Sequence, residues 1–373
     1  MSKNTNLHDA KRAKQDEFYT QWVDIEKEMN AYLEYNPDVF KGKTILLPCD
    51  DPEWSNFTKF FTSRFQDYGI KKLISTSYAP KSNMEGQFYE PEPTLFNDDK
   101  YDEVKDYERG KIFILDGTDK NNDGRINIED IEWEYLQGDG DFRSDEIKGL
   151  RDEADMVITN PPFSLFRDFM AWLVEGDVEF SVIGNMNAIT YKEIFPLIKE
   201  NKIWPGQEFN KTMSFAIPEE YFVKEGSEDK DRFGRNVVKV PAICWFTNIQ
   251  HGRRNEPLPL MTLEENERHN KKIINNPNSY KTYDNYDAIE VPVTLGIPSN
   301  YEGVMGVPIS FLDKYNPEQF EILGSRRWGK NQELLDVYTG DVVPPENDKK
   351  TLIDGKETYD RIFIKHKTQP EDE

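Results

Sequence analysis

Four consecutive residues, Asn160, Pro161, Pro162 and Phe163, combine groups that suit chemistry on a nucleobase. Proline lacks a backbone N–H, so the two prolines stiffen the chain while their carbonyl groups remain acceptors. Asn160 adds a side-chain carbonyl, and an exocyclic amino group needs two acceptors for its two hydrogens. Phe163 offers a flat ring for stacking, worth about 1–3 kcal/mol per base.

An amino group held in this way could act as a nucleophile. Acceptors on both hydrogens localise the nitrogen lone pair, which can then attack a methyl group carried by a sulfonium. In a duplex the same nitrogen is stacked and paired, so the base must be flipped out first. The alternative is that the Pro-Pro pair only ends a strand and that Phe163 belongs to the core, because a short motif needs supporting context.

The segments around the motif indicate a doubly wound α/β fold with a mostly parallel sheet. An apolar strand, Met156–Thr159, precedes the motif, and a helix, Ser164–Val174, follows it. Hydrophobic runs and helical periodicity predict the other elements. The other strands are expected at Thr44–Cys49, Lys72–Ser77, Lys111–Leu115 and Phe180–Gly184, and the other helices at 11–35, Phe57–Phe65, Asp145–Glu153 and Lys192–Glu200.

The later part of the chain has a different pattern of apolar residues. Val237–Thr247 is expected to be one antiparallel strand paired with Met213–Ile217. After Asn248 periodicity fades, which predicts an irregular C-terminal region and a boundary near residue 250. The expected domains are a catalytic domain at 1–250 and a target-recognition region at 251–373.

The formal net charge of −23 is unusual for a protein that contacts phosphates. Residues 97–155 hold 20 acidic and 9 basic residues, so an acidic insertion that faces away from DNA could carry much of the excess. The two cysteines lie in apolar runs, which favours a reducing compartment. The sequence shows no signal peptide and no membrane-length apolar run, so we expect a cytoplasmic protein.

A second pattern has the spacing of a calcium loop of the EF-hand or dockerin type. Asp119, Asn121 and Asp123 occupy positions 1, 3 and 5, the Arg125 carbonyl occupies position 7, and Asp130 occupies position 12. An aspartate at position 12 predicts weaker binding than the usual glutamate. The alternative is a polar surface turn. If calcium binds, we expect a structural role.

Several longer stretches resemble the EcoRI-type adenine-specific DNA methyltransferase family over most of the chain. The stretches, besides the NPPF motif itself, are DEFYT (16–20), CDDPEWSNF (49–57), GDGDFRS (138–144), IGNMNAITYKEIFPLIKENKIW (183–204), YDNYDAI (283–289) and MGVPISFLDKYNPEQFEILG (305–324). The resemblance implies methyl transfer from S-adenosylmethionine to the N6 amino group of a flipped adenine in double-stranded DNA. It also implies a role in restriction–modification, with a cognate restriction endonuclease as partner, or in solitary or phage DNA modification.

The resemblance also implies roles for individual residues. The cofactor would be contacted by Phe18, Tyr19, Thr20, Asp50, Asp51, Pro52, Ser55, Asn56, Asp141 and Phe142. Asp141 would accept from the cofactor's adenine and Phe142 would stack on it. The usual FxGxG pattern is missing, and no clear acid follows the second strand, where a ribose-binding carboxylate is often found.

Further residues are candidates for contacts with the substrate. Asn185, Asn187 and Tyr191 follow a strand, and Arg253 and Arg254 begin a basic stretch that could bind phosphates. Other readings are turn chemistry for the first three and a solvated face for the arginines. Two other functions stay open, namely methylation of RNA or of a protein glutamine amide, and an acidic, calcium-stabilised binding module without catalysis.

Overall fold

The computed structural model describes residues 19–51, 55–79, 100–216, 229–230, 236–325, 336–339 and 351–367. Contacts divide the chain into two compact units. Unit 1 comprises Met1–Asn185 and Lys211–Ile249, and unit 2 comprises Met186–Asn210 and Gln250–Glu373. The break near residue 250 thus coincides with one edge of unit 2, but residues 186–210 also belong to unit 2. The functions assigned to the two parts stay predictions.

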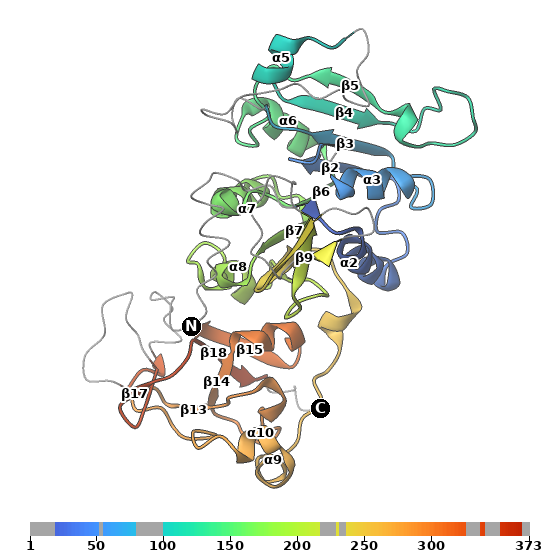
Figure 1. Cartoon of the computed structure of the whole chain (residues 1–373). Helices are drawn as coiled ribbons and strands as arrows, with labels where there is room; N and C mark the ends of the chain where they lie inside the picture. The colour runs from blue at the N-terminus through green and yellow to red at the C-terminus, as the bar shows by residue number, and fades with distance from the viewer. Residues whose placement is uncertain are drawn as a thin grey trace. The chain divides into compact units, whose positions relative to one another are not determined.

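Unit 1 contains a twisted sheet in the order β5-β4-β3-β2-β6-β7-β12 (Figure 1). The pairs β2–β3, β2–β6 and β6–β7 are parallel, and the outer pairs β3–β4, β4–β5 and β7–β12 are antiparallel. The strands are β2 (Thr44–Pro48), β3 (Lys72–Thr76), β4 (Lys111–Leu115), β5 (Glu132–Tyr135), β6 (Met156–Thr159), β7 (Glu179–Asn185) and β12 (Ile243–Thr247). Residues 97–155 therefore supply two strands of this sheet rather than a separate insertion.

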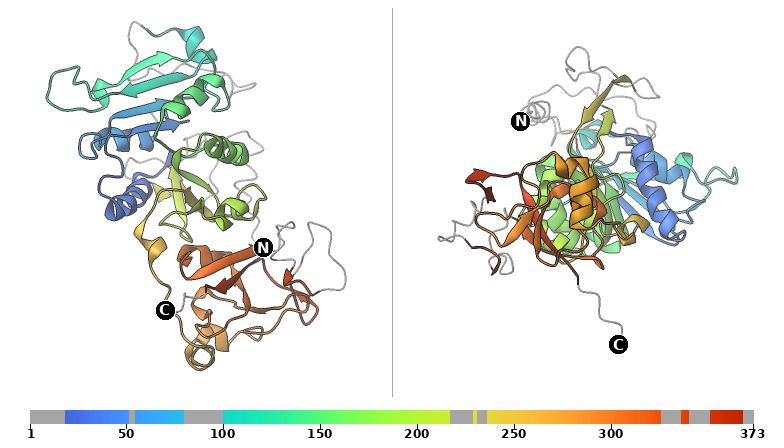
Figure 2. Two further views of the ribbon diagram at one scale, coloured as in Figure 1. Left: turned by 180° about the vertical axis from the view of Figure 1, so that it is seen from behind. Right: turned by 90° about the horizontal axis from the view of Figure 1, so that it is seen from below.

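Helices cover both faces of this sheet, which Figure 2 shows from behind. The helices are α2 (Trp22–Tyr35), α3 (Asn56–Ser63), α5 (Glu103–Glu108), α6 (Asp145–Glu153) and α7 (Phe166–Glu175). Met29 of α2 and Phe60 of α3 share a core cluster with Trp245 of β12. The next residue of β12, Phe246, points to the opposite face, where it meets Phe166 of α7 at a ring separation of 5.2 Å. The expected doubly wound arrangement is thereby present.

Two expected elements are wrong in their extent. The run Val237–Thr247 is two strands, β11 (Asn236–Val240) and β12, because Ala242 takes a positive φ of 61° between them. Of these two strands, β11 pairs with β9 (Met213–Ala216) and β12 joins the main sheet. Residues 11–18 of the helix expected at 11–35 lie outside the described residues, and in the part from residue 19 on the helix begins at Trp22. Tyr19–Thr20 before it forms strand β1, which pairs with β9.

The C-terminal region is more regular than expected. Unit 2 contains a sheet in the order β13-β14-β18-β15, with strands β13 (Ala288–Glu290), β14 (Val304–Pro308), β18 (Arg361–His366) and β15 (Phe320–Ser325). Its strands are short and separated by long connections, so the alternation of apolar and polar residues is too brief to be recognised in the sequence. Short helices and strands complete the two units: β10 (Asp229–Lys230), β8 (Trp204–Pro205), β16 (Leu352–Ile353), β17 (Lys356–Glu357), α8 (Phe195–Lys199), α9 (Leu263–His269), α10 (Lys271–Ile274), η1 (Ile128–Asp130), η2 (Phe163–Leu165), η3 (Met186–Thr190), η4 (Gly252–Asn255), η5 (Thr294–Gly296) and η6 (Ile309–Lys314).

Candidate active site at the carboxyl edge of the sheet

The strand order of unit 1 places a topological switch point beside β2. The chain passes from β2 to β3 on one side and later returns to β6 on the other. Ligands of doubly wound folds bind at the carboxyl ends of the strands at such a point. The segment after β2 and the NPPF motif after β6 both lie at this edge. Asn185, which ends the adjacent parallel strand β7, lies there too.

The segment after β2 is held by buried hydrogen bonds. We call Cys49, Asp50, Asp51 and Ser55 the post-β2 loop; Pro52, a predicted cofactor contact, lies outside the described residues. The backbone N–H of Asp50 donates to the carbonyl of Thr76 at the end of β3 (2.8 Å). The Asp50 side chain is buried and contacts the hydroxyls of Ser55 and Thr159. Asp50 is thus part of the internal structure of the edge.

A loop from distant sequence fills the edge next to β3. The N–H of Ala79 donates to the carbonyl of Asp139 (2.8 Å), and Gly140 has a φ of +87°. A Cβ on Gly140 would lie 2.3 Å from the carbonyl oxygen of Ser77, so only glycine allows this approach. The loop brings Asp139 and Asp141 to the end of β3. Residues 138–142 therefore place acids at the end of β3, where none follows directly in the sequence.

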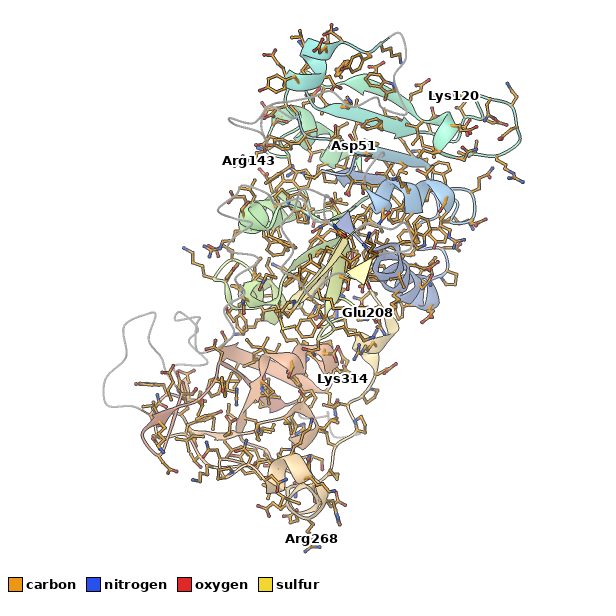
Figure 3. All side chains as sticks on the ribbon, in the orientation of Figure 1. Asp51, Lys120, Arg143, Glu208, Arg268 and Lys314 are labelled. Atoms are coloured by element: carbon orange, nitrogen blue, oxygen red, sulfur yellow. The ribbon has the colours of Figure 1, made fainter. Side chains whose placement is uncertain are left out.

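Asp141 is an ionised carboxylate at this edge. Burial raises its pKa, but hydrogen bonds from Arg143 and Tyr78 outweigh burial and leave the pKa below the usual value. Arg143 binds it with Nη2–Oδ2 at 2.5 Å and Nε–Oδ1 at 2.9 Å. Figure 3 labels Arg143 and Asp51. Burial and the charges of Asp50 and Asp141 raise the pKa of the Cys49 thiol, so Asp141 also lies near the post-β2 loop.

Phe142 does not have the role that the resemblance implied. Its side chain is 1% exposed and packs against Phe169 and Trp172 of α7, at ring separations of 4.9 and 5.8 Å. A ring enclosed in this way cannot stack on a ligand at the sheet edge. Residue type and position after Asp141 do not separate a stacking ring from a core ring, because a phenylalanine suits either role.

The N-terminal motif reaches the same region through the small sheet β1-β9-β11-β10. Thr20 of β1 is opposite Phe215 of β9, and the Phe163 ring lies edge-on to Phe215 at 6.4 Å. The Asn56 side-chain amide donates to the carbonyl of Thr20 (2.7 Å). Thr20, Asn56 and Phe163 are thus brought together. Phe18 lies outside the described residues, as does the side chain of Tyr19.

The NPPF motif forms a turn into helix η2. Pro161 is buried, while Asn160, Pro162 and Phe163 are partly exposed. The Pro162 carbonyl accepts the N–H of Leu165 (3.0 Å), so the turn already uses it. Thr159, which sequence reasoning missed, joins the motif to Asp50 through its hydroxyl. A hydroxyl that ends an otherwise apolar strand directly before the motif was the available signal.

The remaining substrate candidates lie in unit 2. Asn187 is exposed in η3 and Tyr191 is partly buried after it. Arg253 is bound by Asp313 (2.7 Å) and by the Gln207 carbonyl (2.7 Å). Arg254 is 5% exposed, and its guanidinium lies 3.5 Å from the centre of the Trp204 ring. These contacts give the two arginines structural roles and do not favour phosphate binding.

The proposed calcium loop uses its carboxylates internally. Asp119 accepts the N–H groups of Asp123 and Gly124, and Asp130 accepts those of Lys120 and Asn127. Within the part of the chain that the structure describes, no three His, Cys, Asp or Glu side chains are grouped to hold a metal. The calcium prediction therefore receives no support. The same described part contains no helix long and apolar enough to cross a membrane.

Comparison with known proteins shows the family of this chain. A family model described as adenine-specific methyltransferase EcoRI matches residues 6–367. Type II methyltransferase M.EcoRI of Escherichia coli is 40% identical over 98% of this chain and 97% of its own length. Type II methyltransferase M.MpnI of Mycoplasma pneumoniae is 33% identical over 96% of this chain and 97% of its own length. No solved structure matches significantly.

The fold is mixed α/β with a large central sheet, and the matching family and relatives are methyltransferases. The chain belongs to the EcoRI adenine-specific methyltransferase family, which places it among the DNA methyltransferases.

Proposed function

We propose that this protein transfers a methyl group from S-adenosylmethionine to the N6 amino group of adenine in duplex DNA. One observation carries the proposal. The NPPF motif lies at the carboxyl end of β6, beside the post-β2 loop and the switch point of the sheet. Binding pockets of doubly wound folds form at this place, so one edge holds both the candidate cofactor residues and the candidate catalytic residues.

The groups at the edge suit this cofactor. Asp51, Asp139 and Asp141 offer carboxylates, which accept from hydroxyl, amino and ammonium groups and repel phosphate. They favour a cationic nucleoside without phosphates. The Thr20 hydroxyl is buried without a hydrogen-bond partner in the structure as described, and a bound polar group would satisfy it. When bound, S-adenosylmethionine would supply an electrophilic methyl group next to the NPPF motif.

The residues of the motif then act on the adenine. The Asn160 side-chain carbonyl and the Pro161 backbone carbonyl would accept the two amino hydrogens and localise the nitrogen lone pair. The nitrogen could then attack without a covalent protein intermediate. The partly exposed ring of Phe163, braced by Phe215, would stack on the flipped base. Adenine must leave the duplex because its amino nitrogen is otherwise paired.

We assign recognition of the DNA sequence to unit 2, and mainly to residues 251–373. Lys271 and Lys272 of α10 are exposed, and we propose them as candidates for phosphate contacts. No feature of the site favours RNA or a protein amide over DNA. A restriction endonuclease with the same recognition sequence would be a natural partner, because methylation of the host's own sites would protect them.

Substitution of Asn160 tests the proposal. Asn160→Ala should lower transfer of tritiated methyl groups to duplex DNA by at least about 100-fold, because it removes one of two stabilising contacts. Cofactor affinity, measured by calorimetry, should change by less than threefold. Asn160→Asp keeps an acceptor oxygen and should recover part of the activity. RNA and protein substrates run in parallel should stay unlabelled. Equal turnover by Asn160→Ala and the parent would refute the assignment.

A further inference from the structure

The Asp50 carboxyl group connects two parts of the proposed site. Its Oδ1 accepts the Ser55 hydroxyl (2.6 Å), and Ser55 Oγ in turn accepts the N–H of Phe57 as the cap of α3 (3.0 Å). Its Oδ2 lies 2.5 Å from Thr159 Oγ1. Asp50, Ser55 and Thr159 are all nearly or fully buried. The contact therefore ties the post-β2 loop to the residue directly before Asn160.

The number of available hydrogens decides the protonation of this contact. Thr159 Oγ1 also lies 2.5 Å from the carbonyl oxygen of Pro48, which can only accept. A threonine hydroxyl has one hydrogen and can donate to only one of these two oxygens. Both contacts are satisfied when Asp50 Oδ2 carries a proton. Asp50 then donates to Thr159, and Thr159 donates to Pro48.

We propose that Asp50 is a positioning residue that acts as a neutral carboxylic acid, joining the post-β2 loop to Thr159 and thereby fixing the NPPF turn for methyl transfer. This inference rests on the proposed function. It differs from a direct cofactor contact, which the resemblance implied for Asp50, because the Asp50 side chain is buried and both of its carboxyl oxygens are engaged inside the protein, whereas the Asp141 side chain stays partly exposed.

The surroundings of Asp50 favour the neutral form. Burial raises the pKa of Asp50 to about 7, against the lowering effect of the Ser55 and Thr159 hydroxyls, and the charge of Asp51 raises it further. The other titratable neighbour in the loop is Cys49, beyond which lies Asp141. Helix α3 and strand β3 contribute the neutral hydroxyls of Thr58 and Ser75, which bond to the Asp50 backbone carbonyl.

The sign of the pH effect follows from these contacts. Below about pH 7 the carboxyl group is protonated and both Thr159 contacts are satisfied. As the pH rises through this value, the proton is lost and a buried carboxylate competes with the Pro48 carbonyl for one hydroxyl hydrogen. Thr159 then donates to the carboxylate and its hydrogen bond to the Pro48 carbonyl is lost, so the residue before the NPPF turn is held by one contact fewer. The rate of methyl transfer should therefore fall by up to about tenfold per pH unit, as for the loss of a single proton.

Variants of Asp50 and Thr159 test the inference, each checked for folding by thermal melting. Asp50→Ala and Thr159→Val should lower the single-turnover rate at least tenfold at pH 6.5, with cofactor affinity within threefold of the parent. Asp50→Asn should restore the activity lost in Asp50→Ala, since an amide both accepts from Ser55 and donates to Thr159. Because the amide does not titrate, the decline at alkaline pH should disappear. Thr159→Ser keeps the hydroxyl and serves as the matched control.

An infrared measurement gives a reading that is independent of activity. The parent at pH 6 should show the carbonyl band of a protonated carboxylic acid, absent in Asp50→Asn. Absence of this band from the parent, an unchanged alkaline decline in Asp50→Asn, or equal loss of cofactor binding in Asp50→Ala and Asp50→Asn would overturn the inference. A parent protein that methylates no adenine would instead refute the proposed function. The infrared band would still show whether the Asp50 carboxyl group is protonated.

Discussion

Replacing Gly140 by alanine should distort the carboxyl edge of the sheet in unit 1 while leaving most of the fold intact. The residue has a φ of +87°, which costs an alanine about 1–2 kcal/mol. The new Cβ would lie 2.3 Å from the Ser77 carbonyl oxygen, a backbone atom that cannot swing away. The loop must therefore retreat and lose the bond between Ala79 N–H and the Asp139 carbonyl, worth about 1 kcal/mol. We expect a total loss of about 2–3 kcal/mol.

The displacement should also weaken cofactor binding. Asp141 follows Gly140 directly in the sequence. A shift of about 1 Å in a positioning group can lower a reaction rate by roughly 100-fold, so binding should be sensitive to it too. We expect the dissociation constant for S-adenosylmethionine to rise at least tenfold by calorimetry. Chemical denaturation of the same variant gives the loss of stability.

Gly124→Ala is the matched control. Gly124 has a φ of +82°, close to that of Gly140, but a Cβ there would meet nothing within 4 Å. The control should lose only the 1–2 kcal/mol of backbone strain and should bind cofactor within twofold of the parent. Equal losses of stability in the two variants would show that the close approach to Ser77 is unimportant. Parental cofactor affinity in Gly140→Ala would show that Asp139 and Asp141 do not hold the cofactor.

Two further substitutions separate function from packing. Phe163→Ala should reduce the fluorescence rise of a base analogue at the target position, because the flipped base loses its stacking partner. An unchanged rise would assign Phe163 to the core around Phe215. Arg254→Ala should cost about 2 kcal/mol of stability, since it removes a buried cation over the Trp204 ring, and should leave the salt dependence of DNA binding unchanged. If Arg254→Ala instead flattened the salt dependence of DNA binding and kept the stability of the parent, Arg254 would be a phosphate contact.

The local features of unit 1 were readable from the sequence. Strands β2, β4 and β6, helix α6 and the turn after β6 agree with their predicted ranges to within a residue. Each is a short apolar or amphipathic run bounded by polar residues or proline, so its conformation depends on neighbours in the chain. The type and spacing of the residues from Asn160 to Phe163 likewise pointed to the class of chemistry before any fold was known.

Interactions between distant segments could not be read in this way. The sequence showed Asp141 and Phe142 as neighbours, but the fold sends one to the sheet edge and the other into the core beneath α7. It showed adjacent arginines, but the fold buries Arg254 against Trp204. Burial depends on which elements pack together, and the residue type alone does not contain that information.

The carboxyl edge shows the same division most clearly. The amino-acid sequence determined that an acid follows β2 and that a threonine precedes Asn160. Only the tertiary structure decided that these two groups, 109 positions apart, share a contact of 2.5 Å. It also decided that residues 138–142 supply the acids at the end of β3. The physical reason is that hydrogen bonds form between atoms close in space, and parallel strands bring the ends of distant segments to one edge.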